Sequence, residues 1–201
     1  MKAFIICAYA LLAFTALPLQ AHAQDGILTK ANITAYLKQS NEILEGNAGK
    51  FSPAEVQSYL EKHLTGNFLY QDSVTTNLGP FGSGTEVLRY DRDQYINDIL
   101  ANIHSVEKVQ SRIRVGEIQI GGNGQKARVT YSMEAQMQAQ NDQLSALSSS
   151  GKNLSFSIDA SSDCITILNW SQSQGAIQSE QLVCKSNATM NIPREFNPFQ
   201  N

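Results

Sequence analysis

The sequence predicts an α+β fold in which N-terminal helices pack on the concave face of a curved antiparallel sheet. Most of the apolar patterns with the period of a helix lie in the first half of the chain. After position 109, apolar and polar residues alternate with the period of a strand. Helices that are followed by consecutive strands are the element order of an α+β domain.

The first 23 residues have the layout of a secretory signal peptide. Lys2 precedes an apolar run from Ala3 to Leu17, and the small residues Ala21 and Ala23 close the segment. We therefore expect cleavage after Ala23 and a periplasmic or secreted location. The apolar run is shorter than the roughly 20 residues that a membrane span needs. Because no later stretch replaces it, no transmembrane span is expected after cleavage.

Residues 24–190 have the length of one domain, and residues 191–201 form a tail with two prolines and no strand pattern. The formal charge is −3, or −4 once Lys2 is removed, which offers no basic stripe to nucleic acid. The sequence has no metal-ligand spacing, and its one dinucleotide-like glycine motif lies between strands. Neither a metal nor a cofactor is therefore expected.

Two helices are expected near the start of the domain. Apolar residues at helical spacing predict the first over residues 28–45, with Thr29 as its N-cap. The second begins more sharply, because Ser52 and Glu55 have the spacing of a capping box. Gly66 is expected to end this second helix.

A strand is expected next, over NFLYQDSVTTN at residues 67–77, with Tyr70 and Asp72 on the same side because they are two positions apart. The segment LGPFGSGTEV, residues 78–87, is expected to be a loop, because proline and glycine disfavour regular structure.

A third helix is expected to open at Asp91 or Asp93 and to run through DQYINDILANIHSVEK, residues 93–108. The histidines His63 and His104 lie on the second and third helices without the spacing of a metal site. We expect His63 to be a hydrogen-bonded interior histidine and His104 to be a cation near a helix C-terminus.

Two antiparallel strand pairs are expected to complete the domain. RIRVGEIQI, a GGNG turn and a long second arm predict a hairpin over residues 112–140, with Tyr131 on the apolar side of the second arm. The segments at residues 154–170 and 175–185 then supply the second pair.

Cys164 and Cys184 flank the turn of this second pair symmetrically. If the strands pair about that turn, the two residues are direct cross-strand neighbours, which brings them near disulfide reach. A secretory route and an even number of cysteines in the mature chain favour a structural disulfide. The alternative is a redox-active pair, which would need a Cys-x-x-Cys motif or an electropositive helix N-terminus.

The amphipathic run from Val56 to Leu64 that leads into NFLYQDSV, the DQYINDIL helix and the closing strand pairs resemble the NTF2-like, or cystatin-like, α+β superfamily, including its SnoaL-like members. The resemblance covers roughly Leu28 to Met190. It implies a cone between helices and sheet that serves as a pocket. In isomerases and cyclases of the superfamily the pocket takes steroid-like or polyketide substrates, and in non-enzymatic members it holds a partner.

Three functions remain open on this basis. The first is an exported accessory domain that binds an unknown small ligand or protein. The second is a pocket enzyme of the isomerase or cyclase type, with Asp72 as base and Tyr70 or Tyr131 as hydrogen-bond donor. The third is a homodimeric interaction subunit. Because the sequence shows no clustered acid–base set, a non-enzymatic function is favoured.

Overall fold

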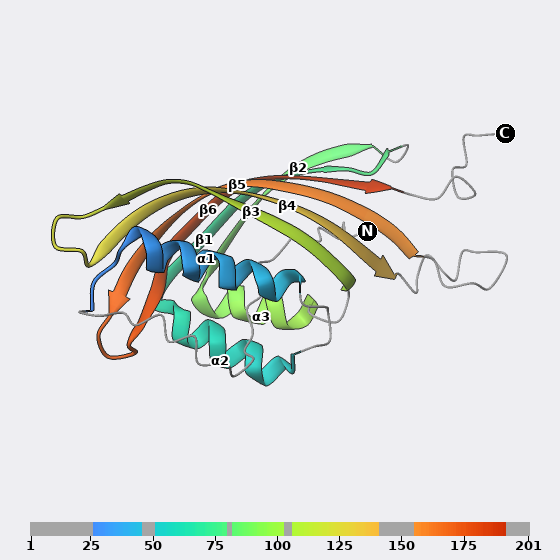
Figure 1. Cartoon of the computed structure of the whole chain (residues 1–201). Helices are drawn as coiled ribbons and strands as arrows, with labels where there is room; N and C mark the ends of the chain where they lie inside the picture. The colour runs from blue at the N-terminus through green and yellow to red at the C-terminus, as the bar shows by residue number, and fades with distance from the viewer. Residues whose placement is uncertain (1–25, 46–50, 80–81, 103–105, 141–154, 192–201) are drawn as a thin grey trace, which may run out of the picture.

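The computed structural model shown in Figure 1 describes residues 26–191, apart from 46–50, 80–81, 103–105 and 141–154. The predicted signal peptide, residues 192–201 of the tail and His104 therefore lie outside the described residues, and the expectations about them stay predictions. No helix in the described part of the chain is long and apolar enough to cross a membrane.

The structure contains helices and strands in the following chain order. They are α1 (Lys30–Glu45), α2 (Pro53–His63), β1 (Leu64–Asn77), β2 (Ser83–Asp91), α3 (Arg92–Asn102), β3 (Val106–Ile120), β4 (Lys126–Gln140), β5 (Ser155–Ser171) and β6 (Ala176–Asn191).

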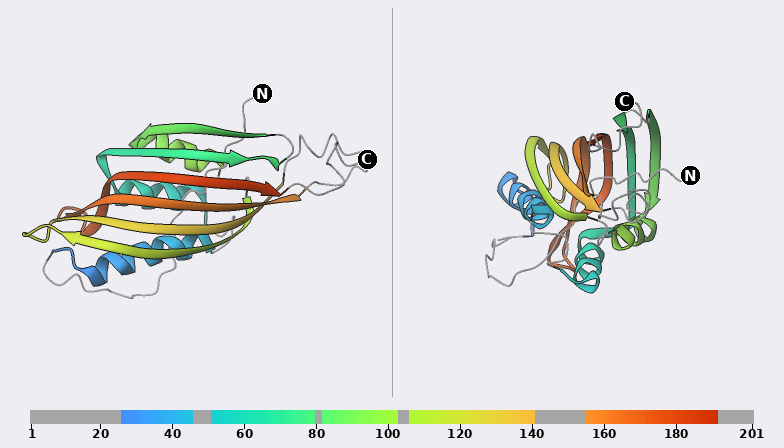
Figure 2. Two further views of the ribbon diagram at one scale, coloured as in Figure 1. Left: turned by 90° about the horizontal axis from the view of Figure 1, so that it is seen from above. Right: turned by 90° about the vertical axis from the view of Figure 1, so that its right-hand side faces the viewer.

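The strands form one six-stranded sheet in the order β2-β1-β6-β5-β4-β3. All three described helices lie on the concave face of this curved sheet, and none of them covers its convex face (Figures 1 and 2). The predicted α+β architecture is therefore confirmed.

The sheet departs from the predicted antiparallel order at one place. β1 and β6 pair in parallel, whereas the other neighbouring strands pair antiparallel. Parallel pairing needs a crossover between the two strands. The crossover here contains β2, α3 and the three strands that follow, so the first strand lies beside the last one.

The prediction of a loop over residues 78–87 was wrong for its second half. Residues from Ser83 onwards belong to β2, which pairs with β1 along the whole of Leu69–Asn77. The glycines that argued for a loop instead form a tight turn, because Gly79 and Gly82 have φ angles of 60° and 100°. Strand pairing begins immediately after that turn.

Two helix ends also differ from the predictions. α2 ends at His63 rather than at Gly66, because Leu64 already has extended backbone, with φ −112° and ψ 135°. Gly66 instead lies within β1, in the stretch where the β1–β6 register shifts. α3 ends at Asn102, and Val106 of the predicted helix begins β3 by pairing with Ala139.

The predicted helix starts are confirmed. The Thr29 hydroxyl accepts from the Asn32 amide at 3.1 Å, and the Asn32 side chain accepts from the Thr29 amide at 2.8 Å. Ser52 and Glu55 form the complete capping box.

The core consists of two main groups of buried side chains. One group joins α2 and α3 to β1, and it includes Leu60, Phe68 and Tyr95. The other joins α1 to the strands β4, β5 and β6, and it includes Leu37 and Val129. The candidate site lies between these two groups.

Candidate functional site

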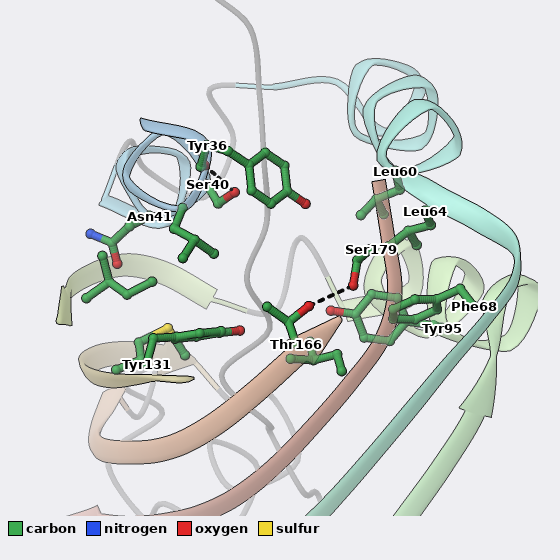
Figure 3. A pocket seen from close by; sticks show the side chains of 14 residues that line it. Tyr36, Ser40, Asn41, Leu60, Leu64, Phe68, Tyr95, Tyr131, Thr166 and Ser179 are labelled. Carbon is green, nitrogen blue, oxygen red and sulfur yellow. Dashed lines mark hydrogen bonds between the residues drawn. The ribbon is translucent and has the colours of Figure 1, made fainter. Parts of the chain in front are cut away.

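A small pocket lies between the two core groups, beneath α1 and α2 and above the concave face of the sheet (Figure 3). Its volume is about 60 Å³, roughly twice the share of one water molecule in the liquid. Leu37 and Ile113 on one side and Leu60 and Phe68 on the other give it largely apolar walls.

A few hydroxyl groups interrupt these apolar walls. Tyr36 from α1 and Tyr131 from β4 direct their hydroxyls toward the space between helix and sheet (Figure 3). On the sheet, the hydroxyls of Thr166 and Ser179 are 3.0 Å apart and bond to each other. The pocket is thus an apolar space with several neutral groups that can donate or accept a hydrogen bond.

Burial keeps the two tyrosines protonated. It raises the pKa of Tyr36 and of Tyr131 well above the ordinary value. The pKa of Tyr131 is raised further by Tyr36 and by the negative charge of Asp72. Both side chains therefore act as neutral hydroxyls near neutral pH, and neither is a base.

Buried hydrogen bonds hold α1 in place above the sheet. The Ser111 hydroxyl donates to Oδ1 of Asn41 at 3.0 Å, and the Asn41 amide donates to the Ser111 carbonyl at 3.3 Å. Ser40, the other polar residue of α1 in the pocket wall, donates to the Tyr36 carbonyl one helical turn earlier, at 2.8 Å. This arrangement fixes the part of α1 that carries Tyr36.

His63, near the end of α2, packs between aromatic side chains. Its ring stacks on Tyr59 at 4.0 Å and lies 5.7 Å from the ring of Tyr36. Nδ1 is 2.8 Å from the carbonyl of Ile177, which can only accept, so the ring carries its proton on Nδ1. Burial lowers the pKa of His63 to about 4, although this carbonyl acts in the opposite direction. The histidine is neutral at pH 7, and the predicted hydrogen-bonded interior role is confirmed.

Asp72 lies on the concave face of β1 and is only 2% exposed. The hydroxyls of Tyr70 and Ser186 donate to its Oδ2 at 3.0 Å and 2.7 Å. Because Ser186 uses its single proton in this bond, Ser162, whose hydroxyl is 2.8 Å away, must donate to Ser186. The structure shows no hydrogen-bond partner for the buried Oδ1 of Asp72.

One row of residues connects Asp72 to the pocket. Asp72 neighbours Cys184 on β6, Cys184 neighbours Cys164 on β5, and Cys164 neighbours Tyr131 on β4. The two cysteines form a disulfide, as predicted, with a Cα–Cα distance of 4.2 Å. The bond therefore lies on the floor of the cone, between the buried carboxylate and the tyrosine of the pocket.

The structure brings the three sequence-predicted site residues to the concave face but does not assemble them into one set. Tyr70 bonds to Asp72, whereas the disulfide separates both from Tyr131. Tyr131 lines the pocket, and Asp72 and Tyr70 lie beside it rather than in its lining. Among the described residues, no group of three His, Cys, Asp or Glu side chains is arranged to hold a metal ion.

Comparison with known protein families and with curated proteins found no match for this chain. Comparison with solved structures found similar folds. A conserved protein from Planctomyces limnophilus is 13% identical, with a TM-score of 0.50, and the match covers 78% of this chain and 94% of that one.

Two further structures are described as NTF2-like. The protein of unknown function from Pseudomonas aeruginosa is 10% identical, with a TM-score of 0.49 over 77% of this chain and 97% of that one. The protein from Cytophaga hutchinsonii is 9% identical, with a TM-score of 0.45 over 79% and 98%. The likeness to the protein from Planctomyces limnophilus is a likeness of fold. At such identities a common fold implies no common ligand or activity.

Proposed function

We propose that the protein is an exported domain that binds a small, largely apolar ligand in the pocket beneath α1 and α2. The observation that carries this proposal is the set of inward-facing hydroxyls of Tyr36, Tyr131 and Thr166 in an otherwise apolar space. An apolar cavity with a few convergent polar groups is the usual form of a small-molecule site. The disulfide supports export, because such bonds persist in oxidising compartments.

The size of the pocket limits the ligand. A volume of about 60 Å³ is far below the roughly 300 Å³ or more of a typical ligand site. A ligand with more than a few heavy atoms therefore requires an outward movement of α1 or of the Tyr36 side chain. The hydrogen bonds between Asn41 and Ser111 oppose a movement of the helix, so we expect the tyrosine to move first.

Filling the pocket tests this proposal. Ser40 is buried in the pocket wall, and its hydroxyl donates to the Tyr36 carbonyl of the same helix. Ser40→Leu therefore fills space at the cost of this bond and of the contact between Ser40 and Tyr59 of α2. Gln39→Leu adds a leucine at the preceding position, which is exposed, and is the matched control. Native mass spectrometry of protein purified from its own compartment measures the bound ligand.

We expect a retained small molecule on the native protein and on Gln39→Leu, and its loss from Ser40→Leu. Equal amounts of ligand on all three proteins would place its site elsewhere. If the native protein carries no small molecule after purification, and still carries none when extract of its compartment is added back, the proposal is wrong.

One observation favours a second function, the pocket enzyme of isomerase or cyclase type. Oδ1 of Asp72 is buried and unpartnered, so it is chemically able to accept a proton, with the Tyr70 hydroxyl as neighbouring donor. The test is the conversion of a β,γ-unsaturated ketone to its conjugated isomer, followed by ultraviolet absorbance. Turnover that Asp72→Asn abolishes and that the exposed Asp163→Asn leaves unchanged would establish it. Absence of turnover would rule out this second function and leave ligand binding as the only proposed function.

A further inference from the structure

Asp72 is a buried carboxylate whose hydrogen-bonding capacity is only half used. An ionised carboxylate accepts at both oxygens. Both described donors, Tyr70 and Ser186, bond to Oδ2, and Oδ1 is enclosed without a partner. Leaving a buried acceptor unpaired is costly, and leaving a buried charge unpaired is more so. The arrangement is complete only when a further donor reaches Oδ1.

No described cation neutralises this carboxylate. The ion pairs in the described part of the chain join Arg92 to Asp93, Arg114 to Glu134 and Lys126 to Glu180, and none includes Asp72. A partner for Oδ1 that supplies both a donor and a positive charge would offset the charge of the ionised carboxylate.

A group of tyrosine rings adjoins Asp72 through the Tyr70 hydroxyl. The ring of Tyr70, whose hydroxyl bonds to Asp72, lies 4.9 Å from the ring of Tyr95 and 5.9 Å from that of Tyr90. Aromatic faces attract ammonium groups, most strongly where water is excluded. A divalent metal ion is a poor fit, because a single carboxylate without a second acidic or histidine ligand is too few for such an ion.

The pocket and Asp72 share a wall of the cone. Leu182 and Thr166 of the pocket lining lie two residues along β6 and β5 from the cysteines that neighbour Asp72. Asp72 is therefore close enough to the pocket lining for the polar end of a short ligand to reach it from this wall.

We propose that Asp72 binds the ammonium group of a small organic amine, and that this amine is the chemical class of ligand that the pocket takes. This inference rests on the proposed binding function and adds the charge of the ligand to it. Tyr70 and Ser186 hold the carboxylate in place through Oδ2, so they act as positioning residues, and Oδ1 is the atom that meets the ligand.

Three probes of similar size and different charge test this proposal at pH 7.5: propylammonium, 1-propanol and propionate. Isothermal titration calorimetry and ligand-observed NMR measure their binding to the mature, disulfide-bonded protein. We expect saturable binding of propylammonium that is about tenfold or more tighter than that of 1-propanol, because only the amine supplies a charged donor. Propionate is expected not to bind.

Asp72→Asn removes the charge at nearly constant shape and is expected to abolish the preference for propylammonium. Asp163→Asn makes the same chemical change at an exposed position and is expected to retain it. Equal binding of the amine and the alcohol to the native protein would overturn the inference, even if Asp72→Asn fails to fold. So would a preference for the amine that persists in Asp72→Asn.

The filled variant Ser40→Leu separates failure of this inference from failure of the proposed function. If 1-propanol binds as well as propylammonium and Ser40→Leu abolishes both, the pocket binds ligands and only the charge assignment is wrong. If none of the three probes binds the native protein, the amine proposal is wrong. If Ser40→Leu binds propylammonium as the native protein does, the amine site does not include the pocket.

Discussion

Asp72 and Cys184 are direct neighbours across the parallel pair of β1 and β6, on the face of the sheet that the helices cover. Cys184 is bonded to Cys164 on the next strand. The disulfide therefore joins β5 to the strand that lies beside the buried carboxylate. Its integrity affects both the stability of the domain and the geometry of the candidate site.

Reduction of the disulfide is expected to destabilise the protein. The bond closes a loop with a sequence separation of 20, for which chain entropy predicts up to about 3 kcal/mol, and less where the reduced hairpin keeps some order. Urea unfolding with and without dithiothreitol measures the difference, and the Cys164→Ala/Cys184→Ala variant is the control that should not respond to reductant. Alkylation of two thiols in non-reduced exported protein would show that the bond does not form.

Protonation of His63 is expected to destabilise the fold at acid pH. The pKa of this residue is about 4 in the folded protein, against an ordinary value of 6.5. Between these values the unfolded chain binds the proton and the folded chain does not, so stability falls as pH decreases from about 6.5 to 4. We expect His63 to account for a loss of about 2 to 3 kcal/mol.

Urea unfolding at pH 7.5 and pH 4.5 measures this loss. His63→Asn keeps a donor for the Ile177 carbonyl but does not titrate, so its stability should change less between the two pH values. An equal loss in the variant would assign the acid sensitivity to other groups.

Removal of the Ser52 cap is expected to weaken α2. The Ser52 hydroxyl accepts from the Glu55 amide, so Ser52→Ala should cost about 1 kcal/mol. Ser58→Ala, at an exposed position within the same helix, should be neutral or slightly stabilising, because alanine is the better helix former. Thermal unfolding compares the two variants, and equal melting temperatures would contradict the role of the cap.

The convex face of the sheet is expected to make a homodimer. Leu69 on β1 and Val87 on β2 are 57% and 51% exposed. The two strands are neighbours, and both side chains lie on this face. Contiguous exposed apolar patches mark protein interfaces, and we expect these two side chains to belong to one. Light scattering coupled to size-exclusion chromatography should give the mass of a dimer.

Leu69→Lys/Val87→Lys should elute at half the native mass. Two lysines at exposed helix positions, Gln39→Lys/Gln57→Lys, provide the control and should leave the dimer intact. A monomer in the native protein would rule out this face as an interface.

The register of the second hairpin was predictable from the sequence, because Cys164 and Cys184 lie symmetrically about their turn. The capping of α1 and α2 was also predictable, because each cap depends on two residues that are only three positions apart. Local spacing decides features of this kind.

The polar group around Asp72 was not predictable in full. Ser186 lies one residue beyond the predicted segment 175–185, so the prediction assigned it to no strand, whereas β6 extends to Asn191. The contact of Ser186 with Asp72, at a separation of 114 positions, depends on the parallel pairing of the first and last strands, for which no local pattern exists. Tyr36 and Thr166 were missed similarly, because the pocket forms only where α1 lies over the sheet.

The parallel pairing of β1 with β6 also decides when the site comes into existence. The strand that carries Asp72 is made early, but it cannot take its place until β6, the last strand of the sheet, has left the ribosome. Contacts between such distant segments form slowly. During most of its synthesis the chain therefore lacks the site that we propose, which comes together only once nearly the whole domain has been made.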